Sequence, residues 1–279
     1  MSNKATKYEF TGETIEFAAR TFHRIRALRD FNDVKKGDLG GFIEKQENLS
    51  HDGTAWVYGD AKVYGDAKVF DNAIVRGNAI VRGNAEVYGN AEVHDNAWVY
   101  GNARVCGNAW VCGNAKVYGD AKVYDNAIVH GNAIMFDEAT VFDEATVFDK
   151  AIVRGNARVC SNAKVCGKAL VDGNALACGN ARVCGDAKVY GDAKVLDNAW
   201  VYGKAKVCGN AWVCGNARVY GDAKVFDNAW VYGKAKVHGD AKVHGDAEVC
   251  GDAEVCGKAK VHGDAKVCGN LNIATVTEL

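Results

Sequence analysis

Proline is absent from the 279-residue sequence, whereas glycine occurs 32 times. A chain with many irregular loops normally places proline in some of them, because proline fixes φ at a value that suits turns. The absence of proline therefore argues against a fold with many different loops. It favours a chain that uses one kind of glycine-rich turn many times.

The sequence also lacks an excess of either charge and any long apolar segment. Lys and Arg number 34 against 35 for Asp and Glu, which gives a net charge of −1. Surfaces dedicated to nucleic acid or to anionic membranes are usually clearly basic, so we expect neither partner. No apolar run is long enough for a membrane span, and the start MSNKATKYEF lacks the apolar core of a signal peptide. We therefore expect a cytoplasmic protein of a bacterial or phage-infected cell, without a cofactor.

A six-residue period dominates the sequence from Ala55 onward. Alanine occupies every sixth position through Ala265. Valine follows two positions after each alanine, except where Met135 and Ala177 take its place. The unit A-x-V-x-[G/D]-[N/D/K/E] is thus repeated 36 times without an insertion. Such a period is the signature of a repeat architecture.

Each six-residue unit predicts a short strand followed by a corner. Side chains two residues apart point to the same side of a strand, so Ala and Val face inward and the x residues face outward. Gly, Asn and Asp tolerate positive φ and therefore suit the corner. One unit cannot bury its valine alone, whereas stacked coils can, because each strand pairs with copies above and below. A period of six does not match the 3.6 residues of a helical turn.

These repeats resemble those of the bacterial transferase hexapeptide superfamily over residues 55–270. The resemblance implies an all-β fold, a single left-handed parallel β-helix of about 12 triangular coils with three repeats per coil. We predict that residues 1–54 form a small N-terminal β cap, with a helix over 14–28 as the alternative, and that residues 271–279 form a C-terminal tail or cap. The stretch DFNDVKKGDLGGFIEKQENLSHDG resembles the lead-in of an uncharacterised enterobacterial and prophage group assigned as acyltransferases.

Three repeats per coil imply that equivalent positions of successive coils stack on one face. The segment DNAWVYGKAKV occurs at 197–207 and again at 227–237. The offset between these copies is not a whole number of coils, so the two copies fall on different faces. This argues that the repetition serves the interior rather than a site on one face.

All eleven cysteines occupy the outward position after the valine position. Cysteines one coil apart stack, but neighbouring strands hold their Cβ atoms farther apart than a relaxed disulfide prefers, so we expect free thiols. A zinc site needs converging ligands, which a flat ladder supplies poorly, so we assign no metal site. The weak candidates are His94, Cys112 and His130, followed by His244 and His262.

One face is predicted to carry a ladder of stacked lysines, Lys188, Lys206, Lys224, Lys242 and Lys260. Stacked cations with aromatic neighbours are typical of a surface that binds an anionic polymer. However, the acidic residues Asp186, Asp222 and Asp240 lie nearby. A solvated face that discourages aggregation is therefore the preferred interpretation, with ligand binding as the alternative.

The middle of the chain is predicted to carry an exposed apolar strip, which marks a surface for a partner or for self-association. Its candidate residues are Ile134, Phe136, Phe142, Phe148, Ile152 and Leu170.

The preferred hypothesis is a non-enzymatic β-solenoid, a rigid structural or protein-interaction module that has a protein partner or self-associates as a dimer or trimer. The resemblance implies an alternative, an acyl-CoA-dependent acyltransferase, whose relatives are trimers with a catalytic histidine and an extruded loop at the subunit cleft. The 36 repeats contain no extruded loop, and no histidine is distinguished as a general base, so we assign no catalytic residue. A third hypothesis, a nucleic-acid mimic, would require a more acidic chain.

Overall fold

The computed structural model describes residues 6–274. The chain divides into two compact units, residues 1–132 and 133–279, which we call unit 1 and unit 2. The described residues form 40 strands and one short 3-10 helix, with no α-helix among them. The prediction of an all-β solenoid with parallel stacked strands is therefore confirmed, while left-handed winding stays an implication of the resemblance.

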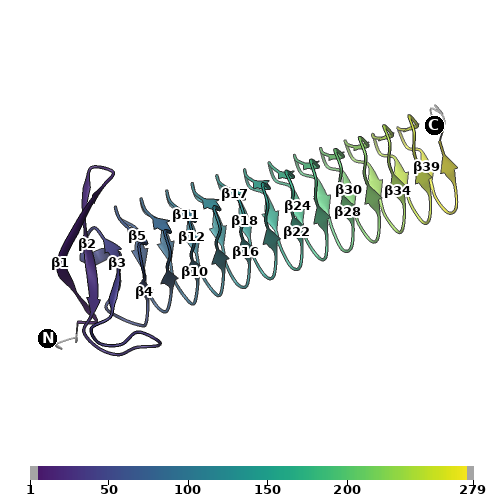
Figure 1. Cartoon of the computed structure of the whole chain (residues 1–279). Coiled ribbons are helices and arrows are strands. Elements are labelled where there is room, and N and C mark those ends of the chain that lie inside the picture. The colour runs from purple at the N-terminus through teal and green to yellow at the C-terminus, as the bar shows by residue number, and fades with distance from the viewer. Residues whose placement is uncertain (1–5, 275–279) are drawn as a thin grey trace. The chain divides into compact units, whose positions relative to one another are not determined.

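Unit 1 begins with an antiparallel hairpin of β1 (Tyr8–Phe17) and β2 (Arg20–Ala27), drawn in purple in Figure 1. Strand β3 (Leu39–Ile43) pairs antiparallel with β2 and parallel with the first coil, and the 3-10 helix η1 (Gln46–Asn48) follows. The preference for strands over a helix at 14–28 is thus confirmed. The proposed boundaries 1–54, 55–270 and 271–279 stay a prediction, and residues 275–279 lie outside the described part.

The rest of unit 1 consists of stacked coils with three parallel ladders of two-residue strands. The first ladder contains β5 (Lys62–Val63), β8 (Ile80–Val81), β11 (Trp98–Val99) and β14 (Lys116–Val117). The second contains β6 (Lys68–Val69), β9 (Glu86–Val87), β12 (Arg104–Val105) and β15 (Lys122–Val123). The third contains β4 (Trp56–Val57), β7 (Ile74–Val75), β10 (Glu92–Val93), β13 (Trp110–Val111) and β16 (Ile128–Val129).

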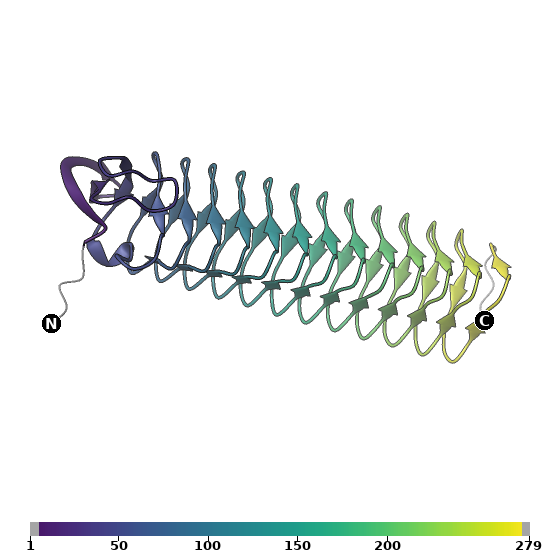
Figure 2. The ribbon, with the colours of Figure 1, turned by 90° about the horizontal axis from the view of Figure 1, so that it is seen from below.

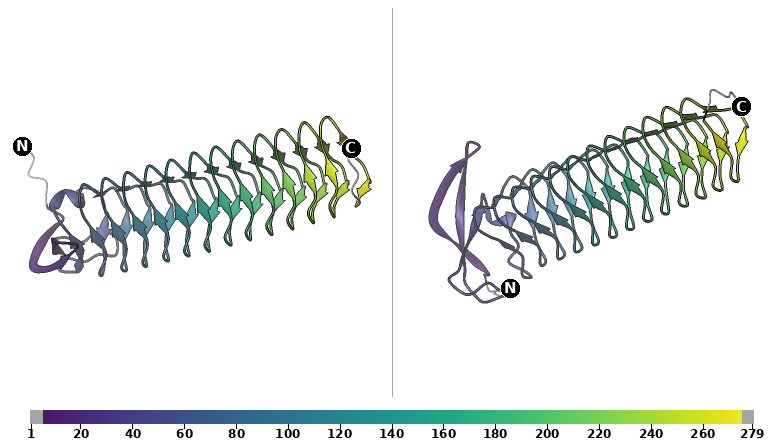
Figure 3. Two further views of the ribbon diagram at one scale, coloured as in Figure 1. Left: turned by 90° about the horizontal axis from the view of Figure 1, so that it is seen from above. Right: turned by 45° about the vertical axis from the view of Figure 1, so that its right-hand side comes forward.

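Unit 2 repeats this arrangement, and Figures 2 and 3 show its successive coils with the strands of each sheet in a row. Its first sheet contains β17 (Ile134–Met135), β20 (Ile152–Val153), β23 (Leu170–Val171), β26 (Lys188–Val189), β29 (Lys206–Val207), β32 (Lys224–Val225), β35 (Lys242–Val243) and β38 (Lys260–Val261). Its second contains β18 (Thr140–Val141), β21 (Arg158–Val159), β24 (Leu176–Ala177), β27 (Lys194–Val195), β30 (Trp212–Val213), β33 (Trp230–Val231), β36 (Glu248–Val249) and β39 (Lys266–Val267). Its third contains β19 (Thr146–Val147), β22 (Lys164–Val165), β25 (Arg182–Val183), β28 (Trp200–Val201), β31 (Arg218–Val219), β34 (Lys236–Val237), β37 (Glu254–Val255) and β40 (Asn272–Ile273).

The interior of the coils follows directly from the repeat. The alanine and valine of every repeat up to Val261 are fully buried, as are Met135 and Ala177 in valine positions. In the coils, the outward strand residue typically donates its backbone N–H to the alanine carbonyl of the next coil, as Lys188 does to Ala205 at 2.9 Å. Each coil therefore satisfies the backbone of its neighbour while the paired valines exclude water.

The corners need a positive φ in a crowded place. At Gly107, with φ of 70°, an added Cβ would come within 2.7 Å of the backbone nitrogen of Asp125. Aspartate replaces glycine where its side chain gains a partner, as at Asp197, with φ of 58°. Its Oδ2 accepts the Gly215 N–H at 2.9 Å. This bond offsets part of the cost of the left-handed conformation.

Candidate interaction face

The first sheet of unit 2 places the five predicted lysines in one continuous ladder. Lys188, Lys206, Lys224, Lys242 and Lys260 are register partners in sequence, each paired with the next. Adjacent strands are about 4.8 Å apart, so the lysines repeat at that spacing along the sheet. Lys188 and Lys224 are exposed, whereas the other three are half-buried. The predicted stacking is therefore present, while its role in binding stays a prediction.

The ladder borders a groove of about 490 Å³. Five lysines and three aspartates line it, namely Lys188, Lys204, Lys206, Lys224, Lys242, Asp186, Asp222 and Asp240. In the described part of the chain, no ion pair within 4.0 Å joins these lysines to these aspartates. The groove is thus cationic by two charges, and its ammonium groups are available to an anionic ligand.

The predicted apolar strip lies in the same sheet as the lysines. Ile134 pairs with Ile152, and Ile152 pairs with Leu170; all three are half-buried. Leu170 in turn pairs with Lys188, the first lysine. We call these eight outward residues the mixed ladder: Ile134, Ile152, Leu170, Lys188, Lys206, Lys224, Lys242 and Lys260. The sequence predicts its halves as separate sites, and the one-coil step from Leu170 to Lys188 joins them.

The three predicted phenylalanines are not brought together by the structure. Phe136, Phe142 and Phe148 directly follow β17, β18 and β19, which belong to three different sheets. Only Phe136 therefore follows a strand of the mixed ladder. Its ring lies 5.9 Å from the guanidinium of Arg154, which also forms a 2.6 Å ion pair with Asp172.

A row of three aromatic rings follows the last three strands of the lysine ladder, β32, β35 and β38. Phe226 stacks on His244 with ring centroids 4.7 Å apart, and His244 stacks on His262 at 5.4 Å. Burial lowers the pKa of His244, and the nearby His262 lowers it further. These histidines were the second candidates for a metal, but their rings face one another in a stack.

The first metal candidates are only partly brought together. The ligand atoms of His94, Cys112 and Asp95 lie within 4.8 Å of one another, whereas His130 is not part of this group. Nδ1 of His94 lies 3.2 Å from Oδ2 of Asp95, which also accepts the Gly113 N–H at 3.1 Å. That backbone bond, together with His94, lowers the pKa of Asp95. Nε2 of His94 is buried without a hydrogen-bond partner.

The expectation of free thiols is wrong for three pairs of cysteines. Disulfides join Cys160 to Cys178, Cys166 to Cys184 and Cys250 to Cys268, with Cα–Cα distances of 4.7, 4.6 and 4.5 Å. These Cα–Cα distances, which the strand spacing sets, fall within the range of known disulfides. Cys106, Cys112, Cys208, Cys214 and Cys256 are free, as predicted.

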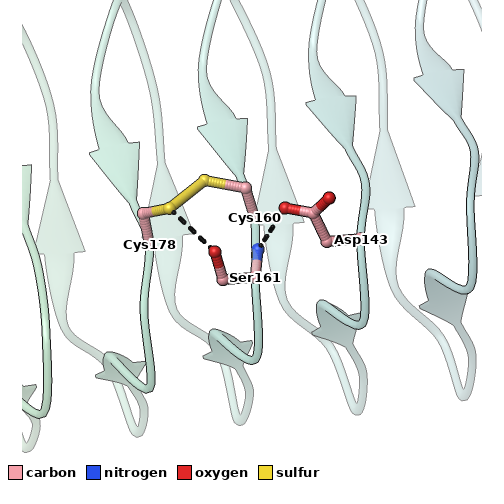
Figure 4. Close-up of a disulfide and its surroundings, with 4 residues drawn as sticks. All are labelled: Asp143, Cys160, Ser161 and Cys178. Atoms are coloured by element: carbon pink, nitrogen blue, oxygen red, sulfur yellow. Dashed lines mark hydrogen bonds between the residues drawn. A yellow bond between two sulfur atoms is a disulfide. The ribbon is translucent and has the colours of Figure 1, made fainter.

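Two of these disulfides and one ion pair join the same two coils. The residues that follow β20, β21 and β22 are Arg154, Cys160 and Cys166, and each is linked to the equivalent residue of the next coil. Figure 4 shows the Cys160–Cys178 bond beside Ser161, whose N–H donates to Oδ2 of Asp143 at 2.9 Å. These links fasten the coils at all three corners, next to the point where Leu170 meets Lys188.

Comparison with known proteins supports the class of fold. Residues 97–113, in unit 1, match the family model described as "YdcK Beta solenoid repeat". No curated protein matches the chain. With the stacked coils described above, this match makes the chain a β-solenoid repeat protein. Within residues 6–274, the structure has no helix of the length and apolarity needed to cross a membrane.

Proposed function

We propose that the chain is a non-enzymatic β-solenoid that acts as a protein-interaction module, and that its binding surface is the mixed ladder of unit 2. The observation that carries the proposal is the pairing of Leu170 with Lys188, which joins three aliphatic side chains and five lysines in one straight row. The partner that fits this row is an extended acidic protein segment with aliphatic side chains at one end.

The two halves of the ladder make different contributions to binding. Fully burying an exposed aliphatic side chain stabilises a complex by about 1.5–3 kcal/mol, and the three aliphatic residues, which are already half-buried, each contribute roughly half of that. An exposed ion pair contributes only about 0–1 kcal/mol, but a row of charges accelerates association and sets orientation. The lysine stems add apolar surface beside their charged ends.

Four further predictions from the sequence form part of this proposal. They are the transferase hexapeptide resemblance, left-handed winding, a phage or prophage origin and a cytoplasmic location. The uninterrupted repeat supports a non-enzymatic role over the acyltransferase alternative, because the resemblance implies an extruded loop at the catalytic cleft.

A designed peptide tests the proposal. The probe is fluorescently labelled, with leucines at one end and alternating glutamates over the rest, made in both sequence directions. We expect it to bind the full chain at low salt, as measured by fluorescence anisotropy. The double variant Lys206→Glu, Lys224→Glu should bind at least about tenfold more weakly, because it opposes the acidic partner.

The matched control carries the same charge change elsewhere. Lys122→Glu with Lys164→Glu alters two exposed outward lysines on strands outside the mixed ladder. Its affinity for the peptide should stay within about twofold of the wild type, allowing for long-range charge effects. Equal weakening in both double variants, or no binding by the wild type, would refute the proposed surface.

A further inference from the structure

Four donor groups converge in the third sheet of unit 2, away from the mixed ladder. Nε2 of His238 lies 2.6 Å from Oε1 of Glu254. Sγ of Cys256 lies within 4.8 Å of a ligand atom of each of these residues. The same sulfur lies 3.8 Å from Oδ1 of Asn272. His238, Glu254 and Cys256 are all half-buried.

The convergence comes from three successive coils. Glu254 is the outward residue of β37, and its register partner in β40 is Asn272. His238 follows β34, and Cys256 follows β37, one coil later. The donors therefore occupy neighbouring positions on the surface although they are far apart in the sequence. No local sequence motif marks the site, so it was not among the predicted metal sites.

We propose that His238, Glu254 and Cys256 bind a thiophilic divalent cation, with zinc as the best fit. Imidazole nitrogen, thiolate sulfur and carboxylate oxygen are the three ligand types that zinc takes from proteins, at about 2.0–2.3 Å. Ligands at those distances are under about 4 Å from one another, so the observed cluster needs only small side-chain rotations to close on the ion. Three protein ligands leave one coordination position for water.

The surroundings hold the ligands in place. The ring of Tyr220 stacks on His238 with centroids 4.6 Å apart, which fixes the plane of the imidazole. In the metal-free chain the Cys256 thiol donates to Oδ1 of Asn272 at 3.8 Å, which positions the sulfur until the ion replaces the thiol proton. Ligand side chains that are already ordered lose less entropy on binding, and such outer contacts typically strengthen a metal site by tenfold or more.

Protons and the cation compete for the same atoms. In the metal-free chain the Nε2–H of His238 hydrogen-bonds to Oε1 of Glu254. On binding, this bond breaks, the imidazole proton moves from Nε2 to Nδ1 through solvent, and the ion takes the freed Nε2 lone pair and replaces the thiol proton of Cys256. One proton per ion is therefore released to solvent from the thiol, and affinity increases with pH. Glu254 binds as the carboxylate. It gives up its hydrogen bond to His238 and coordinates the metal instead.

The group of His94, Asp95 and Cys112 provides a comparison within the chain. There the carboxylate already accepts the Gly113 N–H, and Nε2 of the histidine is enclosed. Its donors are therefore less available than those around Cys256. We expect one tightly bound ion per chain, at the His238 group.

Protection of the thiol against alkylation tests the site directly. The full chain, purified without reductant and freed of metal, is treated with iodoacetamide with and without zinc chloride. Modification of each free cysteine is then followed by peptide mass spectrometry. We expect zinc to slow modification of Cys256 at least tenfold, whereas Cys208 and Cys214 should react at an unchanged rate.

Three substitutions at half-buried positions separate binding from folding. Glu254→Gln should abolish protection of Cys256, while the matched change Glu248→Gln in the second sheet should leave it intact. Circular dichroism checks that both variants keep the strand content of the wild type. An unchanged Cys256 rate in zinc, or protection that survives both Glu254→Gln and His238→Ala, would overturn the proposal.

Discussion

Leu170 and Lys188 are register partners on adjacent strands of one parallel sheet, in successive coils. At this pair the outward surface changes from aliphatic to cationic without a change of face. The coil that contains Leu170 and the coil before it are joined by Cys160–Cys178, Cys166–Cys184 and an ion pair. The change of surface therefore occurs beside the most strongly cross-linked part of the described unit.

Ala177 occupies a valine position, so a larger side chain there should increase the stability of the fold. It is fully buried between Val159 and Val195, its register partners. Ala177→Val adds two buried methyl groups and should raise the free energy of unfolding by about 1 kcal/mol. Val195→Ala should lower it by about 2 kcal/mol. Urea unfolding followed by circular dichroism measures both, and a destabilising Ala177→Val would show that the coil has closed around the alanine.

Lys7 should make stability depend on pH. It is fully buried, and its Nζ donates to the Ala55 carbonyl at 2.7 Å. Burial, with help from Arg29, lowers the pKa of Lys7 to about 8. The pKa of an unfolded lysine is about 10.4. Between about pH 8 and pH 10.4, unfolding therefore takes up a proton. Stability conferred by this group therefore rises with pH across that window.

The comparison with Lys7→Met isolates this effect. From about pH 8 to pH 9.5, the wild type should gain about 1–2 kcal/mol of unfolding free energy relative to the variant. Tyr8 and Tyr58 stay protonated in this range, because burial raises the pKa of each. Urea titrations at several pH values give the difference, and parallel curves for the two proteins would contradict the expectation.

The two disulfides on one pair of coils should be partly redundant. The cysteines of each pair have a sequence separation of 18, and closing a loop of that size stabilises the fold by about 3 kcal/mol in the chain-entropy model. Once one bond joins the coils, the second removes less freedom from the unfolded chain. Replacing both pairs with serine should therefore cost more than the sum of the two single-pair losses. Non-reducing urea unfolding tests this, with the Cys250–Cys268 pair as the independent reference, and strict additivity would count against it.

The interior of the fold was predictable because every repeat solves the same packing problem. Ala and Val alternate with outward residues, and Gly, Asn or Asp occupies each corner, so local preference and burial agree. The outward surface was harder to predict, because it depends on which residues the coils stack together. The ladder of Lys188 to Lys260 followed from the length of one coil, but its continuation through Leu170 was overlooked.

Two features needed side-chain positions rather than spacing. The sulfur atoms of Cys160 and Cys178 are bonded to each other, which a Cβ estimate misses. The cluster of His238, Glu254 and Cys256 combines an outward strand residue with two residues after strands. The 18-residue spacing relates only equivalent positions of successive coils, so it predicts that His94 stacks on Cys112 but does not predict a carboxylate from the neighbouring row.

Inserting repeats after Asp186 tests the central claim, that the aliphatic and cationic halves act as one surface. One neutral repeat, Ala-Thr-Val-Tyr-Gly-Asn, moves every lysine of the ladder to another sheet and leaves all three cysteine pairs in register. Three such repeats restore the sheet and add one coil. The leucine–glutamate peptide, measured by fluorescence anisotropy, should lose at least about tenfold in affinity with one repeat and recover most of it with three. Equal affinity for the two insertion variants would contradict a single continuous surface.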